Sequence, residues 1–435
     1  MQFRMTFGMY LIYSALLAAL LVLGLPFWLF QMLRHGKYRA GLTERLGRVP
    51  QRLRVVPQRP SIWVHAVSVG EVLAVAGLVA KLREAYPQHR VVVSTTTASG
   101  QKLARTRFGE ENVFYFPLDF AFCVRPYLEA LRPELVVLAE TEFWPNFLRL
   151  TKSSGAKVAV VNARISDRSL PGYTRVRRWL RRVLGNVDVL LAQTTEDQNR
   201  LIEIGAVAER VRVAGNLKFD APAAADTELV ARLREVLTRS GSGPIFVCGS
   251  TMEGEESLLL RGFENVLASH PNAVMVLAPR HPERFDKVAS LLDRLRTKYW
   301  RRSLWRGEAV SGGVLLLDSI GELASAYSLA DVAFVGGSLV SHGGHNILEP
   351  AQLGVAIVIG ISYQNFRDIV QLFEKNQAVR IVGAAELPLV FMELVDAPEV
   401  RKALGQKALQ TLRQESGATD RTLCALAEIF PRSTS

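Results

Sequence analysis

Cysteine is scarce in this chain, which has three among its 435 residues. Cys123, Cys248 and Cys424 are too far apart for a CxxC pair, so neither a disulfide scaffold nor a cysteine zinc site is expected. No GxxxxGK[ST] sequence occurs, which excludes a P-loop. Disorder is excluded as well, because hydrophobic residues make up 49% of the chain. The length exceeds that of one ordinary core and predicts two domains.

Acidic residues are fewer than basic ones, 41 against 53, which gives a net charge of +12. Residues 1–220 hold 31 Lys and Arg against 17 Asp and Glu, whereas residues 221–435 hold 22 against 24. All of the positive excess therefore lies in the first half. This polarity favours an anionic membrane surface or an anionic substrate as the partner of that half.

Charged residues are absent between Met5 and Leu33, a stretch long enough to cross the ~30 Å hydrocarbon core of a bilayer. The stretch ends in Pro26-Phe27-Trp28 and Arg34 rather than in a small-residue cleavage site, which predicts an uncleaved anchor and not a signal peptide. Basic residues cluster after it, so the remaining chain is expected to face the cytoplasm. Full crossing and partial embedding both stay open, because Pro26 could bend the segment.

Short apolar, β-branched segments alternate with amphipathic helical segments, a pattern that predicts an α/β fold with parallel sheets covered on both faces. The alternation stops at residues 221–243, which are rich in Ala, Pro, Ser and Gly, and then restarts. We therefore predict two Rossmann-like domains facing a central cleft. The predicted parts are an anchor with its basic flank (1–40), a first domain (41–220), a linker (221–243), a second domain (244–410) and a C-terminal helix (411–435). Strands are predicted at 61–67, 90–95, 112–116, 135–139, 157–162, 189–192, 211–213, 244–248, 273–277, 313–317, 332–335 and 356–359.

Polar residues follow several of these strands, at the carboxyl ends where open α/β sheets bind ligands. Glu71 follows the first strand within HAVSVGE. It is either a carboxylate stabilised by the dipole of a helix N-terminus or a general base. Glu140 and Glu142 follow a buried strand, where they either lie near a helix cap or line a cleft. Lys218 either neutralises an anionic leaving group or is an ordinary surface lysine.

The second domain carries signals for phosphate binding. Ser250 and Thr251 follow its first strand and can present amides and hydroxyls to a phosphate. Arg280, after Pro279, is a natural phosphate partner. The sequence GGSLVSHGGHNILEPA, which starts at residue 336, indicates close backbone approach to a ligand, with a capped glycine-rich turn as the alternative. The candidate donor-binding residues are Ser250, Thr251, Pro279, Arg280, Ile320, Gly321, Glu322, Gly337, Ser338, Asn346, Ile347, Leu348 and Glu349.

Five arginines occur within eight residues in a helical pattern. They form either a solvated helix face or a face for anionic lipid headgroups or an anionic acceptor. Nucleic acid is the least favoured partner, because no RNP or KH pattern accompanies them. The five are Arg175, Arg177, Arg178, Arg181 and Arg182.

In this order, these segments resemble the 3-deoxy-D-manno-octulosonic acid (Kdo) transferases, membrane-anchored GT-B glycosyltransferases of the lipopolysaccharide inner core. The resemblance rests on the Arg45-Leu-Gly47, Asn162-Ala-Arg164-Ile-Ser166 and Gly321-Glu322-Leu323 elements and on HAVSVGE, ETEFWPN, GNLKFD, GSTxEGEE, PRHPERF and GGSLVxxGGHNILEPA. It implies CMP-Kdo as donor, the lipid A precursor (lipid IVA) as acceptor, no cofactor or metal, and the inner membrane as location. It also implies roles for single residues: a catalytic base (Glu71), stabilisers of the transition state (Glu140 and Lys218) and CMP-binding positions (Pro279, Arg280, Ile320, Gly321, Glu322, and Asn346 to Glu349).

The reaction implied by the resemblance is a direct displacement with inversion. A single leaving phosphate can be stabilised by Arg280, Lys218 and helix amides without a divalent metal. Two positions depart from the family pattern, because Met252 and Ser362 stand where histidine is common. The alternatives are a GT-B transferase or epimerase that uses a UDP-sugar, and an anchored basic scaffold that binds anionic lipid or nucleic acid.

Overall fold

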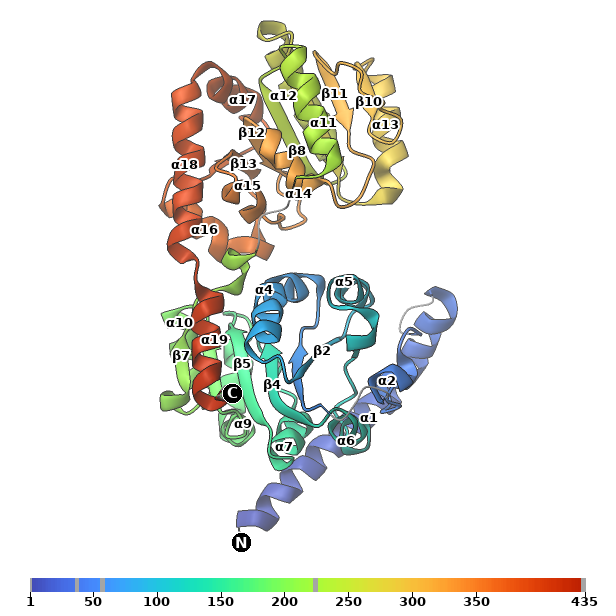
Figure 1. Cartoon of the computed structure of the whole chain (residues 1–435), viewed down its shortest axis with the longest axis vertical. Coiled ribbons are helices and arrows are strands. Elements are labelled where there is room, and N and C mark those ends of the chain that lie inside the picture. Colours follow the sequence, from blue (N-terminus) through green and yellow to red (C-terminus); the bar gives the residue numbers. More distant parts are fainter. Residues whose placement is uncertain (1, 36–38, 55–58, 222–225, 432–435) are drawn as a thin grey trace. The chain divides into compact units, whose positions relative to one another are not determined.

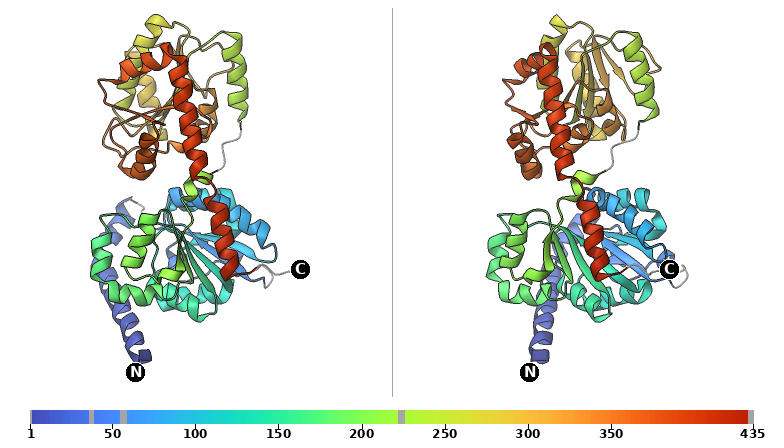
Figure 2. Two further views of the ribbon diagram at one scale, coloured as in Figure 1. Left: turned by 90° about the vertical axis from the view of Figure 1, so that its left-hand side faces the viewer. Right: turned by 60° about the vertical axis from the view of Figure 1, so that its left-hand side comes forward.

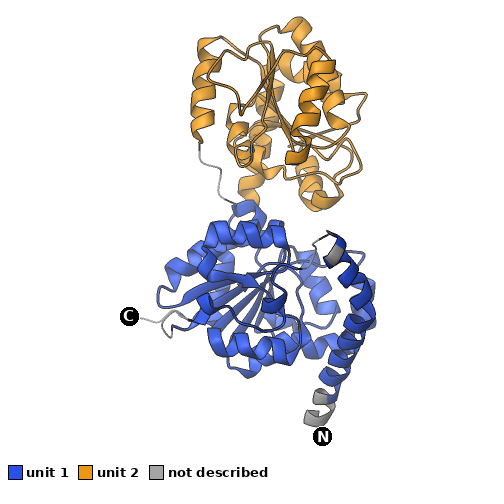
Figure 3. Ribbon diagram, turned by 90° about the vertical axis from the view of Figure 1, so that its right-hand side faces the viewer, with its two compact units in different colours: residues 1–221, 416–435 blue, residues 222–415 orange. Residues whose placement is uncertain are grey.

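The computed structural model describes residues 2–35, 39–54, 59–221 and 226–431. It contains two compact units, one formed by residues 1–221 with 416–435 and the other by residues 222–415 (Figure 3). Each unit holds one seven-stranded sheet, and every strand pair is parallel. The predicted α/β class with two parallel sheets is therefore confirmed.

The sheet of unit 1 has the strand order β3-β2-β1-β4-β5-β6-β7 (Figure 1). Figure 2 shows helices on both of its faces, and two apolar cores separate them from the sheet. The strands are β1 (Ser61–His65), β2 (Arg90–Thr95), β3 (Val113–Tyr115), β4 (Pro133–Ala139), β5 (Lys157–Ala163), β6 (Val189–Ala192) and β7 (Val211–Val213).

The helices of unit 1 divide between the two faces of its sheet. Helices α3, α6, α7, α9 and α10 pack over the core around Trp63, and α4, α5 and α19 cover the opposite core. Their bounds are α1 (Gln2–His35), α2 (Leu42–Arg45), α3 (Gln51–Arg54), α4 (Val69–Ala85), α5 (Ala98–Phe108), α6 (Ala121–Leu131), α7 (Pro145–Ser153), α8 (Leu170–Arg175), α9 (Arg177–Leu184), α10 (Thr195–Glu203) and α19 (Ala418–Ile429).

The sheet of unit 2 has the order β10-β11-β9-β8-β12-β13-β14. Its strands are β8 (Ile245–Thr251), β9 (Val274–Pro279), β10 (Tyr299–Arg301), β11 (Gly313–Leu316), β12 (Val332–Val335), β13 (Ala356–Gly360) and β14 (Arg380–Val382). Its helices are α11 (Glu228–Arg239), α12 (Glu255–Ser269), α13 (Phe285–Arg294), α14 (Leu323–Ala326), α15 (Leu348–Gln352), α16 (Arg367–Lys375), α17 (Leu387–Asp396) and α18 (Pro398–Glu415).

The end of the chain returns to unit 1. Helix α18 belongs to unit 2 and α19 to unit 1, with the break at Gly417, whose φ of 94° suits glycine. The Asp220 carboxylate accepts hydrogen bonds from Gly417 N, at 2.6 Å, and from Thr419 N, which fixes the start of α19. The boundary expected after residue 410 lies inside α18, because no residue there interrupts the helix.

Candidate functional site

Glu71 lies in the first turn of α4, immediately after β1. Its Oε2 accepts a hydrogen bond from Val67 N at 2.8 Å, and its Oε1 accepts one from Ser68 Oγ at 2.9 Å. Ser68 in turn caps α4 by accepting from Glu71 N, so the two side chains form a reciprocal cap. The side chain is 8% exposed, and this burial raises the pKa of the Glu71 carboxyl to about 7, with the nearby charge of Glu140 contributing. A carboxylate with this pKa is suited to proton abstraction near neutral pH.

Glu140 and Lys218 lie together at the same edge of the sheet. Glu140 follows β4 with a φ of 55°, an uncommon conformation for a residue other than glycine. Lys218 lies in a short 3₁₀ segment, Leu217–Asp220, after β7, and its Nζ is 3.6 Å from Glu140 Oε1. Because Glu140 also acts on the Glu71 carboxyl, the structure brings all three predicted catalytic residues to the carboxyl edge of one sheet.

Glu142 adds a further carboxyl to this edge. Trp144 Nε1 donates to Glu142 Oε2 at 2.8 Å, and burial raises the pKa of the Glu142 carboxyl. The negative charges of Glu140 and Glu142 both raise the pKa of Glu71. Three carboxyls at one edge therefore favour keeping one of them protonated near neutral pH.

Two further residues support this edge, although sequence reasoning gave neither a role. Asn162 ends β5 with a φ of 55°, and its Oδ1 accepts from Leu217 N at 3.0 Å, which positions the Lys218 segment. Arg45 donates to Thr96 O, and its guanidinium lies 4.5 Å from the centroid of the Tyr115 ring. Their motifs are part of the family resemblance, which is the signal that could have indicated both.

In unit 2, the structure brings Arg280, Asn346 and Glu349 together. Asn346 Nδ2 donates to Glu349 Oε1 at 3.4 Å. Burial raises the pKa of the Glu349 carboxyl, and the charge of Arg280 opposes that rise. His345 lies beside them, and burial lowers the pKa of its imidazole to about 4, with Arg280 adding to the effect. The cluster thus has a cation, a carboxyl and a neutral imidazole.

The remaining donor candidates differ in exposure. Ile320 is 79% exposed and Gly321 is exposed as well, so this loop lies at the surface of unit 2. Glu322 is held from behind by Arg302, whose Nη2 lies 3.0 Å from its Oε1. By contrast, the side chains of Ile347 and Leu348 are buried, and only their backbone is suited to a ligand.

Three of the residues predicted to bind the donor, Thr251, Gly337 and Ser338, have internal hydrogen-bond partners. The buried Glu255 carboxylate accepts from Gly337 N at 2.7 Å and from Ser338 N at 2.9 Å, so these amides are already occupied. Thr251 is fully buried, and its Oγ1 donates to Glu256 Oε1 at 2.8 Å. Backbone nests bind carboxylates as readily as phosphates, and here an internal carboxylate fills the nest.

Ser362, one of the two departures from the family pattern, supports the glycine-rich turn. Its Oγ accepts from Gly343 N at 3.1 Å and donates to Gln364 Oε1 at 3.0 Å. Met252, the other departure, donates its backbone N–H to Glu255 Oε2 at 2.8 Å. Ser362 therefore holds the backbone of the turn at Gly343, whereas Met252 contributes its own backbone N–H to the Glu255 carboxylate.

The arginine-rich segment forms two short helices, α8 and α9, which are separated at Val176. Val176 is 43% exposed and so does not pack into the core. Leu180 and Val183 pack into the core of unit 1. All five arginines, Arg175, Arg177, Arg178, Arg181 and Arg182, are exposed.

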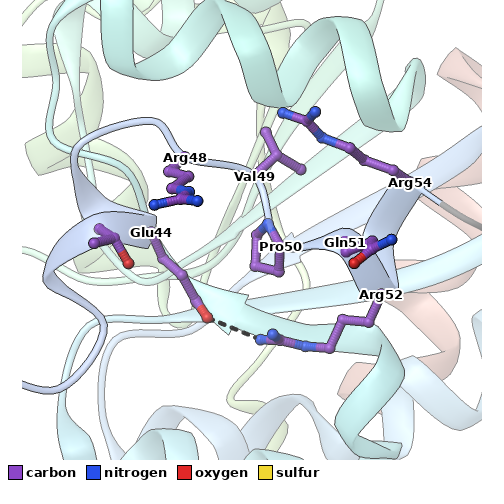
Figure 4. Close-up of a pocket in the computed structure, with 8 residues that line it drawn as sticks. Glu44, Arg48, Val49, Pro50, Gln51, Arg52 and Arg54 are labelled. Atoms are coloured by element: carbon purple, nitrogen blue, oxygen red, sulfur yellow. Dashed lines mark hydrogen bonds and ion pairs between the residues drawn. The ribbon is translucent and has the colours of Figure 1, made fainter.

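A second basic feature lies just after α1. A pocket of about 680 Å³ is lined by Arg48, Arg52 and Arg54 together with Glu44 (Figure 4). The Glu44 carboxylate is paired with Arg52 at 3.0 Å, which leaves a net positive lining. Sequence reasoning did not single out this pocket.

No group of three or more His, Cys, Asp and Glu residues in the described part of the chain could hold a metal ion. Metal independence stays a prediction.

Comparisons with known proteins agree on one family. A family model described as 3-deoxy-D-manno-octulosonic-acid transferase (kdotransferase) matches residues 40–221. The 3-deoxy-D-manno-octulosonic acid transferase of Haemophilus influenzae is 33% identical over 401 residues, 91% of this chain and 93% of that protein. The enzyme of the same name from Bordetella pertussis is 33% identical over 416 residues, 92% of this chain and 95% of that protein.

The fold has a wider distribution. The crystal structure of UDP-GlcNAc 2-epimerase from Neisseria meningitidis matches with a TM-score of 0.56 and 13% identity, covering 85% of this chain and 100% of that one. A likeness at this identity concerns the fold alone, and it is the GT-B fold of two Rossmann-like domains.

Proposed function

The chain belongs to the Kdo transferase family and is a glycosyltransferase of lipopolysaccharide biosynthesis, and from this premise we propose that it moves Kdo from CMP-Kdo to the lipid A precursor, lipid IVA. The reaction is one displacement with inversion and requires no metal ion. The observation that carries the proposal is the meeting of Glu71, Glu140 and Lys218 at the carboxyl edge of the unit 1 sheet.

Glu71 acts as the general base. As the acceptor oxygen attacks the anomeric carbon of Kdo, its proton passes to the Glu71 carboxylate. The bond between that carbon and the phosphate oxygen breaks, and CMP leaves with the electron pair. The pKa of about 7 supports this role, because a base of that strength is both ionised and able to hold a proton near neutral pH.

Lys218 and Glu140 stabilise charge in the transition state. The Lys218 side chain is only 26% exposed, and its ammonium lies 3.6 Å from the Glu140 carboxylate, which holds it at the edge of the sheet. A fixed cation stabilises the negative charge that develops as a phosphate departs. Glu140 offers a negative charge to an oxocarbenium-like sugar in the same step.

Unit 2 binds the nucleotide. Arg280 contacts the phosphate through charge-assisted hydrogen bonds, and the Glu349 carboxyl, oriented by Asn346, accepts from ribose hydroxyls. The exposed loop at Ile320 and Gly321 also takes part in binding the nucleotide. The amides of Gly337 and Ser338 have no part in this assignment, because both donate to the Glu255 carboxylate.

The enzyme works at the cytoplasmic face of the inner membrane. Within α1, residues Gly8–Met32 are long and apolar enough to enter a bilayer, with a mean hydropathy of 2.1. Basic residues follow this segment, and unit 1 carries the positive excess of the chain. An acceptor that is itself a lipid requires such a location.

Mass spectrometry of the lipid A precursor after incubation with enzyme and CMP-Kdo tests the proposal. We expect a product that carries added Kdo, and no product with the Glu71→Ala variant, which should still be stabilised by CMP in a thermal shift assay. Stabilisation by UDP but not by CMP would contradict the donor and would favour the UDP-sugar alternative.

A further inference from the structure

The N-terminal half of α1 is not free, because its aromatic side chains are bound to unit 1. The Arg149 guanidinium lies over the Tyr10 ring, 4.8 Å from its centroid, and Asn186 Nδ2 donates to the Tyr10 hydroxyl at 3.3 Å. Tyr10 is only 4% exposed. One turn later, the Tyr13 ring lies 5.9 Å from the Trp179 ring of α9. These contacts join α1 to both α7 and α9.

A polar contact next to these rings connects α1 to the start of α7. The Asp119 carboxylate caps that helix by accepting from Asn146 N at 3.0 Å and from Phe147 N at 2.7 Å. The Asn146 side chain then donates to Ser14 Oγ at 3.0 Å, and the Tyr13 hydroxyl hydrogen-bonds Asp119. The contact therefore uses buried polar groups that α7 needs for its own cap.

One face of α1 follows unit 1 beyond these contacts. Half-buried positions recur three or four residues apart, at Leu17, Leu21, Gly24, Trp28 and Gln31, which places them on the face of Tyr10. Figures 1 and 3 show α1 running beside the rest of unit 1. The less exposed positions of α1 therefore lie on the same face as its contacts at Tyr10, Tyr13 and Ser14.

The opposite face of α1 is apolar and exposed. It carries ten large hydrophobic side chains, with exposed fractions between 46% and 82%. No charged residue interrupts it. An exposed apolar surface of this extent indicates contact with lipid or with another protein. The ten are Leu11, Ile12, Leu16, Leu20, Val22, Leu23, Leu25, Phe27, Leu29 and Phe30.

The docking contacts and a full membrane crossing exclude each other. The 25 residues Gly8–Met32 rise about 37 Å at 1.5 Å per residue, which is the thickness of the hydrocarbon core and more. In a spanning helix, Tyr10 to Ser14 would lie at the membrane surface opposite to residue 35. Unit 1 follows residue 35, so it could not also contact Tyr10.

We propose that α1 is a monotopic anchor that lies in the plane of the membrane, with Tyr10, Tyr13 and Ser14 docked on unit 1 and the opposite face in the acyl chains of the cytoplasmic leaflet. This inference rests on the membrane location proposed above and adds its geometry. A helix of this kind needs one apolar face for lipid and another face for a partner.

The surroundings of the docked helix favour lipid as the occupant of its outer face. Trp179 joins α1 to α9, and the exposed Arg178 and Arg182 lie one and three positions from it on the same short helix. A cationic rim beside an apolar face matches the anionic headgroups above the acyl chains of a cytoplasmic leaflet.

Nitroxide depth measurements on full-length protein test the geometry. Single spin labels at Ile12→Cys, Leu23→Cys and Phe27→Cys report from the outer face, in vesicles of phosphatidylethanolamine and phosphatidylglycerol and in a background without Cys424. We expect the three labels at one depth, and an immobilised label shielded from lipid at the inner-face control Leu21→Cys. A spanning helix would instead separate the depths of Ile12 and Phe27 by about 20 Å along the bilayer normal, since the two positions are 15 residues apart.

Cysteine labelling in cells gives an independent answer. Thr6→Cys should react with a membrane-impermeant maleimide only after the inner membrane is opened, in step with the exposed native Cys424. Reaction of Thr6→Cys in intact spheroplasts would overturn the in-plane anchor and leave the transferase proposal untouched. Recovery of the protein as a lipid-free dimer that buries the outer face would overturn it as well, in favour of a second copy as the occupant.

Discussion

Replacing Glu71 by glutamine separates a catalytic role of this residue from a structural one. The change removes the charge and keeps the shape of the side chain. A glutamine can still accept from Val67 N through its oxygen and can donate to Ser68 Oγ through its amide, so both contacts at the start of α4 can persist. Any loss of activity would then reflect the missing carboxylate.

The stability of this variant should depend on pH with a definite sign. Burial raises the pKa of Glu71 from 4.5 to about 7, which corresponds to about 3 kcal/mol of unfolding free energy. The folded state holds this proton more tightly than the unfolded chain. The contribution of Glu71 is therefore complete below about pH 4.5 and is lost as the pH rises through about 7. A glutamine side chain does not titrate, so the variant does not lose this stability as the pH rises.

The Glu71→Gln variant is therefore expected to be about as stable as the wild type near pH 5 and more stable by about 3 kcal/mol near pH 8. Its transfer rate should fall by about 10²–10⁴, the usual contribution of a general base. Urea unfolding at both pH values and transfer from CMP-Kdo measure the two effects, with Glu84→Gln on the exposed face of α4 as the control. Equal destabilisation at both pH values, or retained transfer, would refute the reasoning.

Three further substitutions test other parts of the site. Lys218→Ala should lower kcat by about 10²-fold and leave the Kd for CMP unchanged, with partial rescue by Lys218→Arg, because the cation acts on charge that develops in the transition state; weaker CMP binding by calorimetry would contradict this. Arg280→Ala should raise the Kd for CMP by about 10–100-fold, because the variant loses a hydrogen bond to a charged group. Unchanged affinity would show that Arg280 does not contact the phosphate. Glu255→Ala should lower the thermal midpoint of unit 2 by several degrees, because it leaves the buried Gly337 and Ser338 amides unpaired; an unchanged midpoint would show that water replaces the carboxylate.

Most strands could be predicted from the sequence, because buried parallel strands are continuous apolar segments bounded by polar residues. The two missed strands, β10 and β14, are the outer strands of the unit 2 sheet and have three residues each. Both begin or end with an arginine, and neither residue set is fully buried. Edge strands of this length lack the apolar pattern on which the prediction depends.

The candidate site could be predicted in part. Glu71, Glu140 and Lys218 follow strands of one sheet, and parallel strands bring their carboxyl ends to one edge, so their meeting follows from topology. The partner of the Gly337 and Ser338 amides could not be predicted, because a nest that binds a phosphate and one that binds Glu255 have the same local sequence. Only the fold shows which acceptor is present.

The docking of α1 also lies beyond sequence reasoning. The hydropathy pattern indicates one apolar segment, but it does not indicate which residues Tyr10, Tyr13 and Ser14 contact. Their partners Asn146, Asn186 and Trp179 are more than 130 residues away along the chain, and only the folded unit brings them together.

The most direct test of the central claim is the mass of the lipid A precursor after incubation with the full-length enzyme and CMP-Kdo, with Glu71→Ala as the matched control. The account predicts that the wild type adds Kdo to the precursor and releases CMP, whereas the variant binds CMP and leaves the precursor unchanged. A precursor that stays unmodified with the wild type, while a UDP-sugar is consumed in its place, would contradict it.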